Sequence, residues 1–250
     1  MRRPVLKFAA LAVAVYIAGL VALFPASLAV RWFVPDMPGV TLGTADGTVW
    51  NGHIAGISYR GWNIGAAEWS LEPLALFGLA IGADVLIERP GRGPVAANVR
   101  ITPSDIEFTA LRGAVTLEEL GRAGMLPANV ASGEVILNLE QLVVRNDLPV
   151  AADGVLGLTD LRSALLPGVA LGSYEADVET TESGISATFS EIEAPLDIAG
   201  QAEVKPDGSY TVSGTITPTP ETPESLRRGL ALLGQPDASG RYEFGFSGRL

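Results

Sequence analysis

The chain has 250 residues, a formal net charge of −11, 48% hydrophobic residues, one histidine and no cysteine. This length is sufficient for one large hydrophobic core or two small ones. The negative charge disfavours nucleic acid as a partner because it repels phosphates, and the lack of cysteine excludes disulfides and thiolate sites.

The first element that the sequence predicts is a membrane-spanning helix. Residues 8–30 (FAALAVAVYIAGLVALFPASLAV) carry no charge, and a segment of this length spans a bilayer. Three cations precede it: Arg2, Arg3 and Lys7. The positive-inside rule therefore places residues 1–7 in the cytoplasm and residues 31–250 beyond the inner membrane, in a bacterial periplasm.

A cleaved secretory signal is the alternative interpretation of this segment. Ser27-Leu28-Ala29 is a tolerable small-x-small cleavage site. The apolar run is longer than the usual core of a signal peptide, which favours an uncleaved membrane anchor. Both interpretations deliver the same acidic domain to the far side of the membrane.

After the apolar run, the hydrophobic period changes to two. Apolar residues alternate with polar ones in eight segments: 69–71, 79–87, 106–110, 135–139, 174–178, 185–189, 210–216 and 242–246. Such alternation is typical of half-buried strands with one wet face. The Asp-Gly pairs at 46–47, 153–154 and 207–208 predict tight turns. We therefore expect residues 31–250 to be mostly β, forming a long, coiled antiparallel sheet with a few short helices.

A weak internal repeat also runs through this part of the chain. A predicted strand leads into a short helical turn at residues 69–78, 156–168 and 214–234, and more faintly at 112–124. In each case polar residues precede an apolar cluster and glycine follows it. Chance similarity in a chain rich in leucine and glycine is the alternative explanation.

Motifs for catalysis are missing from the sequence. The chain has no phosphate-binding loop, no zinc-binding His-Glu-x-x-His and no Gly-x-Ser-x-Gly nucleophile elbow. Its carboxylates fall mainly on the polar phase of the strands, where a solvated face explains them. The single imidazole, His53, is expected to make a structural hydrogen bond rather than to act as a general base. We predict a protein that is not an enzyme, with no catalytic residue, cofactor or metal site.

The short segment GTVWNG, residues 47–52, frames a tryptophan between two glycines. We expect Trp50 to fill the core end of the first strand. Gly47 and Gly52 would permit a turn and the close approach of a neighbouring backbone. The tryptophan is thus predicted to have a structural role first.

Three stretches of the sequence together resemble the type II secretion system protein N family, also called general secretion pathway protein N. They are residues 43–52 (GTADGTVWNG), 57–78 (ISYRGWNIGAAEWSLEPLALFG) and 232–250 (LLGQPDASGRYEFGFSGRL). The resemblance covers essentially the whole chain and rests on the order and spacing of these pieces. The residues that carry it as a structural motif are Gly47, Trp50, Gly52, Trp69, Pro73, Gly240 and Tyr242.

The resemblance implies a single-pass protein of the inner membrane whose C-terminal domain faces the periplasm. It would be an accessory component of the machine that moves folded proteins across the outer membrane. The implied partners are other type II secretion components in the inner membrane and periplasm, docked at sheet edges or apolar patches, and the bilayer itself through residues 8–30.

A second hypothesis assigns the chain to lipid handling. A coiled sheet lined on its inner face by Leu79, Ile81, Val85, Leu137 and Leu139 would form an apolar trough for acyl chains. The repeat pattern also resembles periplasmic lipid-handling proteins of the AsmA kind. Alternatively, these side chains pack against the short helices, and co-purified lipid would distinguish the two accounts.

Overall fold

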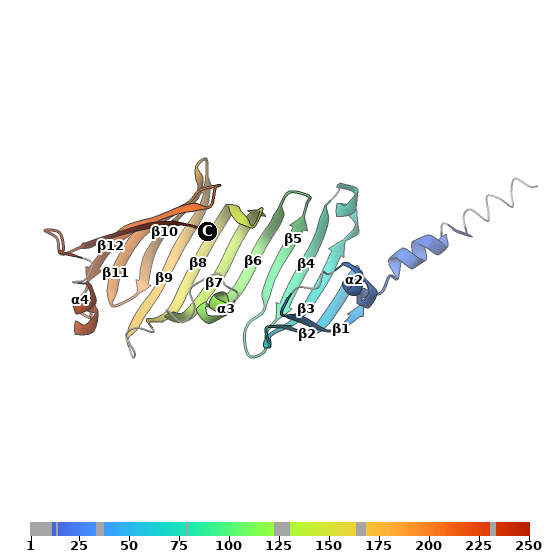
Figure 1. Cartoon of the computed structure of the whole chain (residues 1–250), viewed down its shortest axis with the longest axis horizontal. Coiled ribbons are helices and arrows are strands. Elements are labelled where there is room, and N and C mark those ends of the chain that lie inside the picture. The colour runs from blue at the N-terminus through green and yellow to red at the C-terminus, as the bar shows by residue number, and fades with distance from the viewer. Residues whose placement is uncertain are drawn as a thin grey trace, which may run out of the picture. The chain divides into compact units, whose positions relative to one another are not determined.

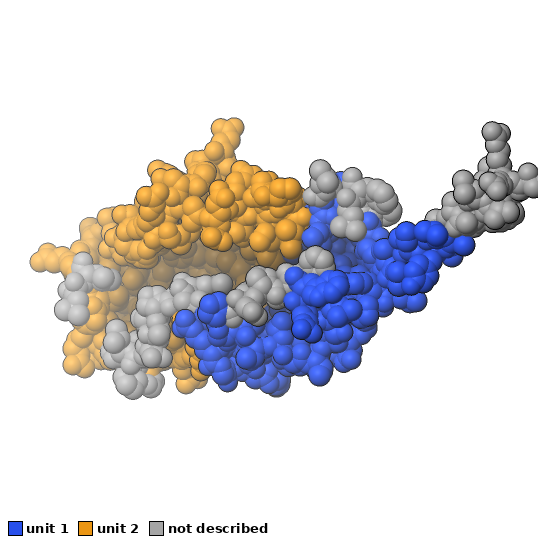
Figure 2. Space-filling model, turned by 45° about the vertical axis from the view of Figure 1, so that its right-hand side comes forward, with its two compact units in different colours: residues 1–100 blue, residues 101–250 orange. Residues whose placement is uncertain are grey.

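The computed structural model describes residues 12–13, 15–33, 38–78, 80–122, 131–163, 169–230 and 234–250. The chain divides into two compact units, Met1–Arg100 and Ile101–Leu250, which are coloured separately in Figure 2. The described residues contain thirteen strands, and within each unit the strands neighbour one another in chain order (Figure 1). The prediction of a mostly β, antiparallel fold with a few short helices is confirmed.

Among its described residues, unit 1 has two labelled helices, a helical stretch that precedes them, and the first five strands. The helices are α2 (Ala26–Phe33) and η1 (Pro73–Gly78). The strands are β1 (Val40–Gly47), β2 (Asn51–Tyr59), β3 (Trp62–Glu72), β4 (Ile81–Glu88) and β5 (Val95–Ile101), which ends at the unit boundary.

The N-terminal segment of unit 1 is helical but interrupted. Residues 12, 13 and 15–22 are helical, Leu23 lies in a turn, and α2 begins at Ala26. Of the predicted membrane segment, residues 8–11 and 14 lie outside the described residues, as does the predicted cytoplasmic part, residues 1–7. Within the described part of the chain, no helix is both long and apolar enough to cross a membrane.

The described part of unit 2 contains two short α-helices and the remaining eight strands. The helices are α3 (Leu117–Arg122) and α4 (Glu224–Leu230). The strands are β6 (Ile106–Thr116), β7 (Ala131–Arg145), β8 (Leu148–Ser163), β9 (Ala170–Thr181), β10 (Gly184–Glu193), β11 (Leu196–Val204), β12 (Ser209–Pro218) and β13 (Tyr242–Arg249).

The strands of unit 2 form because their side chains alternate between an apolar and a polar face. In β9, Tyr174 and Val178 are buried, whereas Glu175 and Asp177 between them are exposed. Since successive side chains of a strand point to opposite faces, one face of the sheet collects the apolar groups. Two buried clusters lie on that side: Ala152, Val178 and Ile185, and Leu196, Leu226 and Leu230.

A short helix follows a strand at three of the four places where the sequence suggested a repeat, and the repeat itself stays a prediction. η1 follows β3, α3 follows β6, and α4 comes after β12. At the fourth place, residues 156–163 belong to β8 and residues 164–168 lie outside the described residues. α3 begins with a capping box, because the Thr116 N–H donates to Glu119 Oε2 (2.8 Å) and the Glu119 N–H donates to Thr116 Oγ1 (3.3 Å).

The three predicted Asp-Gly turns differ in outcome. Asp207 and Gly208 do lie in the turn between β11 and β12. Asp46 and Gly47 are the last two residues of β1, paired with β2, and the connection follows them. Asp153 and Gly154 instead lie inside β8, at a register shift against β7 where Glu140 has no partner. Gly154 has a φ of +134°, so its freedom serves a β-bulge rather than a hairpin turn.

Candidate functional site

The GTVWNG segment forms the tight connection between β1 and β2. Gly47 has a φ of +88°, and a Cβ there would lie 2.5 Å from the Asn51 carbonyl oxygen. The Thr48 N–H donates to that oxygen (2.9 Å), and the Asn51 N–H donates to Thr48 Oγ1 (3.2 Å). Trp50 therefore lies in the connection, half-buried, and not within the first strand as the sequence suggested.

Trp50 joins this connection to the end of the N-terminal helical residues. Its indole Nε1 donates a hydrogen bond to the Val21 carbonyl oxygen (2.8 Å). Beside it, the Val49 N–H donates to the Phe24 carbonyl oxygen (2.8 Å). The last four carbonyls of a helix have no partner within the helix. The bonds from Trp50 and Val49 therefore supply donors to carbonyls of this kind, at the end of the helical residues (Val21) and just after it (Phe24). Pro25 also forms an isolated antiparallel bridge with Thr48.

A second tryptophan fixes the other side of the connection. Trp69 in β3 donates from Nε1 to the Val49 carbonyl oxygen (2.9 Å), and the Leu71 N–H donates to the Trp50 carbonyl oxygen (2.6 Å). The Trp69 ring lies over Gly52, where a Cβ would be 2.1 Å from the ring. The absence of a side chain at Gly52 thus makes room for the Trp69 ring, whereas we expected it to make room for a neighbouring backbone.

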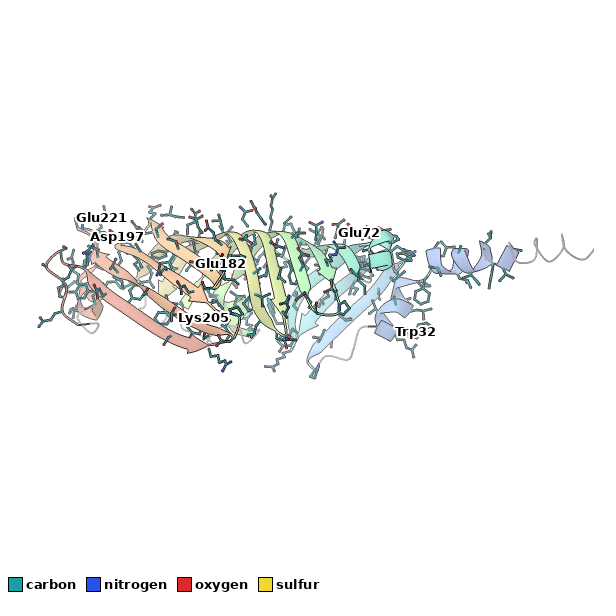
Figure 3. All side chains as sticks on the ribbon, turned by 90° about the horizontal axis from the view of Figure 1, so that it is seen from above. Trp32, Glu72, Glu182, Asp197, Lys205 and Glu221 are labelled. Carbon is teal, nitrogen blue, oxygen red and sulfur yellow. The ribbon has the colours of Figure 1, made fainter. Side chains whose placement is uncertain are left out.

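We call Val21, Phe24, Val49, Trp50 and Trp69 the N-terminal junction. Next to it, α2 packs against β1 and β2 through two small residues, Ala26 and Ala29, which are 0% and 7% exposed. The rings of Phe24 and Trp32 are 5.7 Å apart, and Trp32, labelled in Figure 3, is 65% exposed. α2 therefore has a small-residue face on the sheet and an apolar face outside it.

The N-terminal segment up to Leu23 exposes apolar side chains. Seven large ones are at least half exposed: Val13, Val15, Tyr16, Ile17, Leu20, Val21 and Leu23. Burying such surface away from water stabilises a protein by about 25 cal/mol per Å². A surface of this kind favours an apolar environment over water.

His53 lies on β2 between two carboxylates of the neighbouring strands. It is opposite Asp46 of β1 and Glu68 of β3 in the strand register. Its Nδ1 is 3.6 Å from Glu68 Oε1, and among the described residues it has no hydrogen-bond partner. The structural hydrogen bond that the sequence suggested is therefore not made at Nδ1.

The remaining motif residues lie outside the junction. Pro73 begins η1 directly after β3. Gly240 of unit 2, with a φ of +81°, closes a turn in which its N–H donates to the Asp237 carbonyl oxygen (2.9 Å). The N–H of Arg241 donates to the Asp237 carboxylate and is the main reason that the pKa of Asp237 is below its usual value. Tyr242 begins β13 and packs against the Leu196 cluster.

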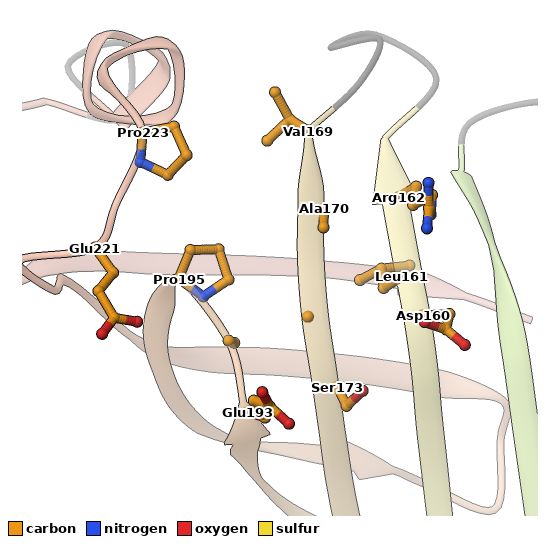
Figure 4. A pocket seen from close by; sticks show the side chains of 12 residues that line it. Asp160, Leu161, Arg162, Val169, Ala170, Ser173, Glu193, Pro195, Glu221 and Pro223 are labelled. Atoms are coloured by element: carbon orange, nitrogen blue, oxygen red, sulfur yellow. The ribbon is translucent and has the colours of Figure 1, made fainter.

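Unit 2 contains a hollow of about 600 Å³ (Figure 4). Asp160 and Arg162 of β8 line it, together with Glu193 at the end of β10 and Glu221 before α4. All four side chains are exposed, so solvent surrounds their charges. Among the described residues, no three metal-ligating side chains of the His, Cys, Asp and Glu types gather closely enough to hold a metal ion.

The five residues of the predicted acyl-chain trough do not belong to one unit. Ile81 and Val85 lie on β4 of unit 1, whereas Leu137 and Leu139 lie on β7 of unit 2. Leu79 lies outside the described residues. The trough stays a prediction.

Comparisons with known proteins agree on one family. The family model for type II secretion system (T2SS), protein N matches residues 38–245. Type II secretion system protein N of Aeromonas hydrophila is 28% identical over 262 aligned residues that cover 100% of both chains. The protein of the same name from Vibrio cholerae is 26% identical, covering 87% of this chain and 88% of its own.

A third relative, type II secretion system protein N of Pectobacterium carotovorum subsp. carotovorum, is 23% identical over 87% of each chain. No solved structure matches this chain significantly. The sequence similarity extends across both compact units.

Proposed function

The chain belongs to the type II secretion system protein N family, and from this membership we propose that it is a non-enzymatic accessory component of that system. The observation that carries the proposal is the family match over residues 38–245, which includes nearly all described strands. Its partners are other components of the secretion machine.

We further propose that the chain is fixed in the inner membrane with the sheet in the periplasm. The exposed apolar side chains of the N-terminal helical residues support insertion into lipid, and the three preceding cations favour a cytoplasmic start. Ala26 and Ala29 pack on the sheet, so the part of residues 8–30 within the bilayer ends before α2. Trp32 is suited to the interface, where tryptophan is enriched.

In this arrangement the N-terminal junction couples the membrane segment to unit 1. Two hydrogen bonds of 2.8 Å, from Trp50 Nε1 and the Val49 N–H, end on carbonyls of the N-terminal segment. A further bond from Trp69 holds Val49 in place. The sheet is therefore held at a defined position beside the bilayer, where other bitopic components are within reach.

A secretion assay tests both parts of the proposal. In a strain without its own copy, the wild-type chain should restore export of a type II substrate to the medium. A variant with residues 1–22 replaced by a cleavable signal peptide keeps α2 and the sheet but removes the membrane segment. We expect it to export much less substrate at equal abundance and protease resistance.

The two parts fail in different ways. If the deletion strain exports normally, the accessory role is wrong. If the released domain restores full export, the role stands but membrane attachment is not needed for it. Co-purification of lipid with either form tests the alternative of an acyl-chain trough.

A further inference from the structure

β13 is the edge strand of unit 2. Among the described residues it pairs only with β12, in a register without shifts from Tyr242↔Ile216 to Arg249↔Ser209. The end marked C in Figure 1 lies directly after this strand. Beyond Phe244 every residue of the strand is exposed, and Phe246 is 56% exposed; Leu250, directly after the strand, is 63% exposed. The outer side of β13 is therefore open to a partner.

The hydrogen bonds identify which backbone groups face this open side. The Leu250 N–H donates to the Gly208 carbonyl oxygen (2.9 Å), so the backbone of Leu250 faces β12. Residues of an antiparallel pair alternate between hydrogen-bonded and non-hydrogen-bonded positions. The backbone N–H and C=O groups of four residues consequently point outward: Glu243, Gly245, Ser247 and Arg249.

An independent bond on β12 agrees with this assignment. The Ser209 carbonyl oxygen accepts a hydrogen bond from the Lys205 N–H (2.8 Å), so Ser209 faces β11. Its partner on the other side, Arg249, is therefore not hydrogen-bonded to it and turns its backbone outward.

The side chains along the edge have opposite character on the two faces. The outward-bonding residues place a carboxylate at one end, Glu243, and a guanidinium at the other, Arg249, with two small residues between them. On the apolar face, Phe244 stacks between Phe189 and Phe246 at centroid distances of 6.5 Å. Phe189, Phe244 and Phe246 thus form a row of stacked rings, and the exposed ring of Phe246 lies on the edge strand.

We propose that β13 pairs with β13 of a second copy of this chain, antiparallel, about a two-fold axis at Phe246. In that register Glu243 lies opposite Arg249 of the second copy, twice by symmetry, and Gly245 lies opposite Ser247. On the apolar face Phe246 meets its own counterpart, and Tyr242 meets Leu250. Such an isologous contact closes on itself, as two-fold interfaces do.

Charge selects this register among its neighbours. Moving the axis by one residue to Gly245 sets Glu243 opposite Ser247 and Arg249 opposite Arg241, a like charge. Moving it to Ser247 sets Arg249 opposite Gly245, which carries no charge. Only the register centred on Phe246 pairs both charges, and opposite charges across a strand pair stabilise it.

Apart from the two charges that the proposed register pairs, the strand lacks the common obstacles to edge pairing. β13 has no proline, lysine or register shift, the features by which edge strands usually avoid association. Arg249 donates from Nε and Nη2 to the Asp207 carbonyl oxygen. A guanidinium has five N–H donors, so a carboxylate of the second copy still finds free donors on it.

A single-cysteine crosslink tests the register, because the natural chain has no cysteine. Phe246 falls in a non-hydrogen-bonded pair with its counterpart, where Cα atoms are about 4.5 Å apart, within the range of a disulfide. Full-length Phe246→Cys in detergent should oxidise to a covalent dimer several-fold more than Thr211→Cys. Thr211 is an exposed residue of β12, about 16 Å from its counterpart in the proposed dimer.

Charge reversal provides a second, independent measurement. Glu243→Arg or Arg249→Glu alone opposes like charges twice, so each should lower the dimer fraction in sedimentation or light scattering. The double variant exchanges the charges and should restore the dimer. This rescue separates the contact between copies from the bond of Arg249 to Asp207, which the double variant also lacks.

Three results would overturn the proposal. They are a wild-type full-length chain that stays monomeric, a Phe246→Cys crosslink no stronger than that of Thr211→Cys, and a double charge variant as monomeric as the single ones. If the chain is monomeric, the partner of the open edge of β13 would instead be an extended segment of another protein.

Discussion

At the scale of single residues, one indole nitrogen joins parts of unit 1 that are 29 positions apart in sequence. Trp50 Nε1 donates to the Val21 carbonyl oxygen, which lies near the end of the N-terminal helical residues. A ring of this size contributes packing as well as the bond, because its apolar body is half-buried. The two contributions can be separated by substitution.

Trp50→Phe keeps most of the ring and removes only the donor. We expect it to lower the free energy of unfolding by about 1 kcal/mol, the usual net value of one hydrogen bond. Trp50→Ala should cost about 2–3 kcal/mol, less than for a fully buried aromatic residue. Chemical denaturation of the full-length chain in detergent measures both.

The matched control for the donor is Trp32→Phe. Trp32 is 65% exposed, so the same chemical change there should shift the free energy of unfolding by less than about 0.5 kcal/mol. Equal losses at the two positions would contradict a specific role for the bond to Val21.

A second residue-scale prediction concerns Gly52. A methyl group at this position would lie 2.1 Å from the Trp69 ring, so the ring must move and its bond to Val49 is strained. We expect Gly52→Ala to lower the free energy of unfolding by about 1–3 kcal/mol, as overpacking does. Gly93→Ala is the control, since nothing lies within 4 Å of a Cβ there. A neutral Gly52→Ala would show that the ring is not fixed.

Tyr174 gives a prediction about alkaline pH. Burial, and then the charge of Glu191, raise the pKa of Tyr174 from 10 to about 12, and its hydroxyl donates to the Leu171 carbonyl oxygen (2.6 Å). As pH rises, the unfolded chain loses this proton first. The contribution of Tyr174 to stability is therefore constant below about pH 10 and declines between about 10 and 12.

Tyr174→Phe removes this titration. The difference in unfolding free energy between wild type and variant should therefore shrink as pH rises from about 9 to about 11.5. Denaturation curves of both chains over that range provide the measurement. A difference that stays constant with pH would mean that the tyrosine titrates alike in both states.

The candidate site was only partly accessible from the sequence. The glycine frame and the two tryptophans stand out in the residues around GTVWNG, and the structure does bring Trp50, Gly52 and Trp69 together. The partners of Trp50 are backbone carbonyls, which every residue has, so no side-chain pattern marks Val21 or Phe24. The one available signal was Pro25, which interrupts helices and sits at the break.

At the scale of elements, α4 is stabilised by packing against the strands beneath it. α4 has seven residues, too few for a stable helix in isolation. Its buried Leu226 and Leu230 pack with Leu196, and Arg227 donates to the Thr219 and Thr222 carbonyl oxygens. The packing of two leucines is thus the main force that keeps α4 formed.

Leu226→Ala should therefore unfold α4 locally. We expect amide hydrogen exchange across Glu224–Leu230 to accelerate strongly, with a global loss of about 2–3 kcal/mol, since Leu226 is 6% exposed. Arg228→Ala, an exposed change on the same helix, should leave exchange nearly unchanged. Similar acceleration in both variants would indicate that helix propensity, not packing, controls α4.

The strands were more predictable than their irregularities. In segments such as 174–178 and 185–189, apolar and polar residues alternate because one face of the strand is buried and the other is exposed to solvent. This alternation can be read directly from the sequence. The bulge at Gly154 does not follow from alternation, because Asp-Gly accepts a positive φ in a turn and in a bulge alike. Only the register against β7 distinguishes them, and register is a long-range property.

At the scale of the whole molecule, the N-terminal segment has two parts with different surfaces. Its first described residues expose large apolar side chains, whereas α2 presents small residues to the sheet. Pro25 separates the two parts and is itself bridged to Thr48. This division bears directly on whether the chain is processed after Ala29.

Signal cleavage after Ala29 requires an accessible backbone, and the structure places this residue within α2. Ala29 is 7% exposed, and its N–H donates to the Pro25 carbonyl oxygen (3.2 Å). Cutting there would also remove Val21 and Phe24, whose carbonyl oxygens accept the hydrogen bonds from Trp50 and Val49. We therefore expect the protein isolated from membranes to retain its residues before Ala29, as intact mass spectrometry would measure.

A periplasm-active reporter fused after Leu250 should be active in the same cells, since the preceding cations favour a cytoplasmic start. A mature form beginning at Val30 would refute the uncleaved anchor, and a reporter active only in the cytoplasm would refute the orientation.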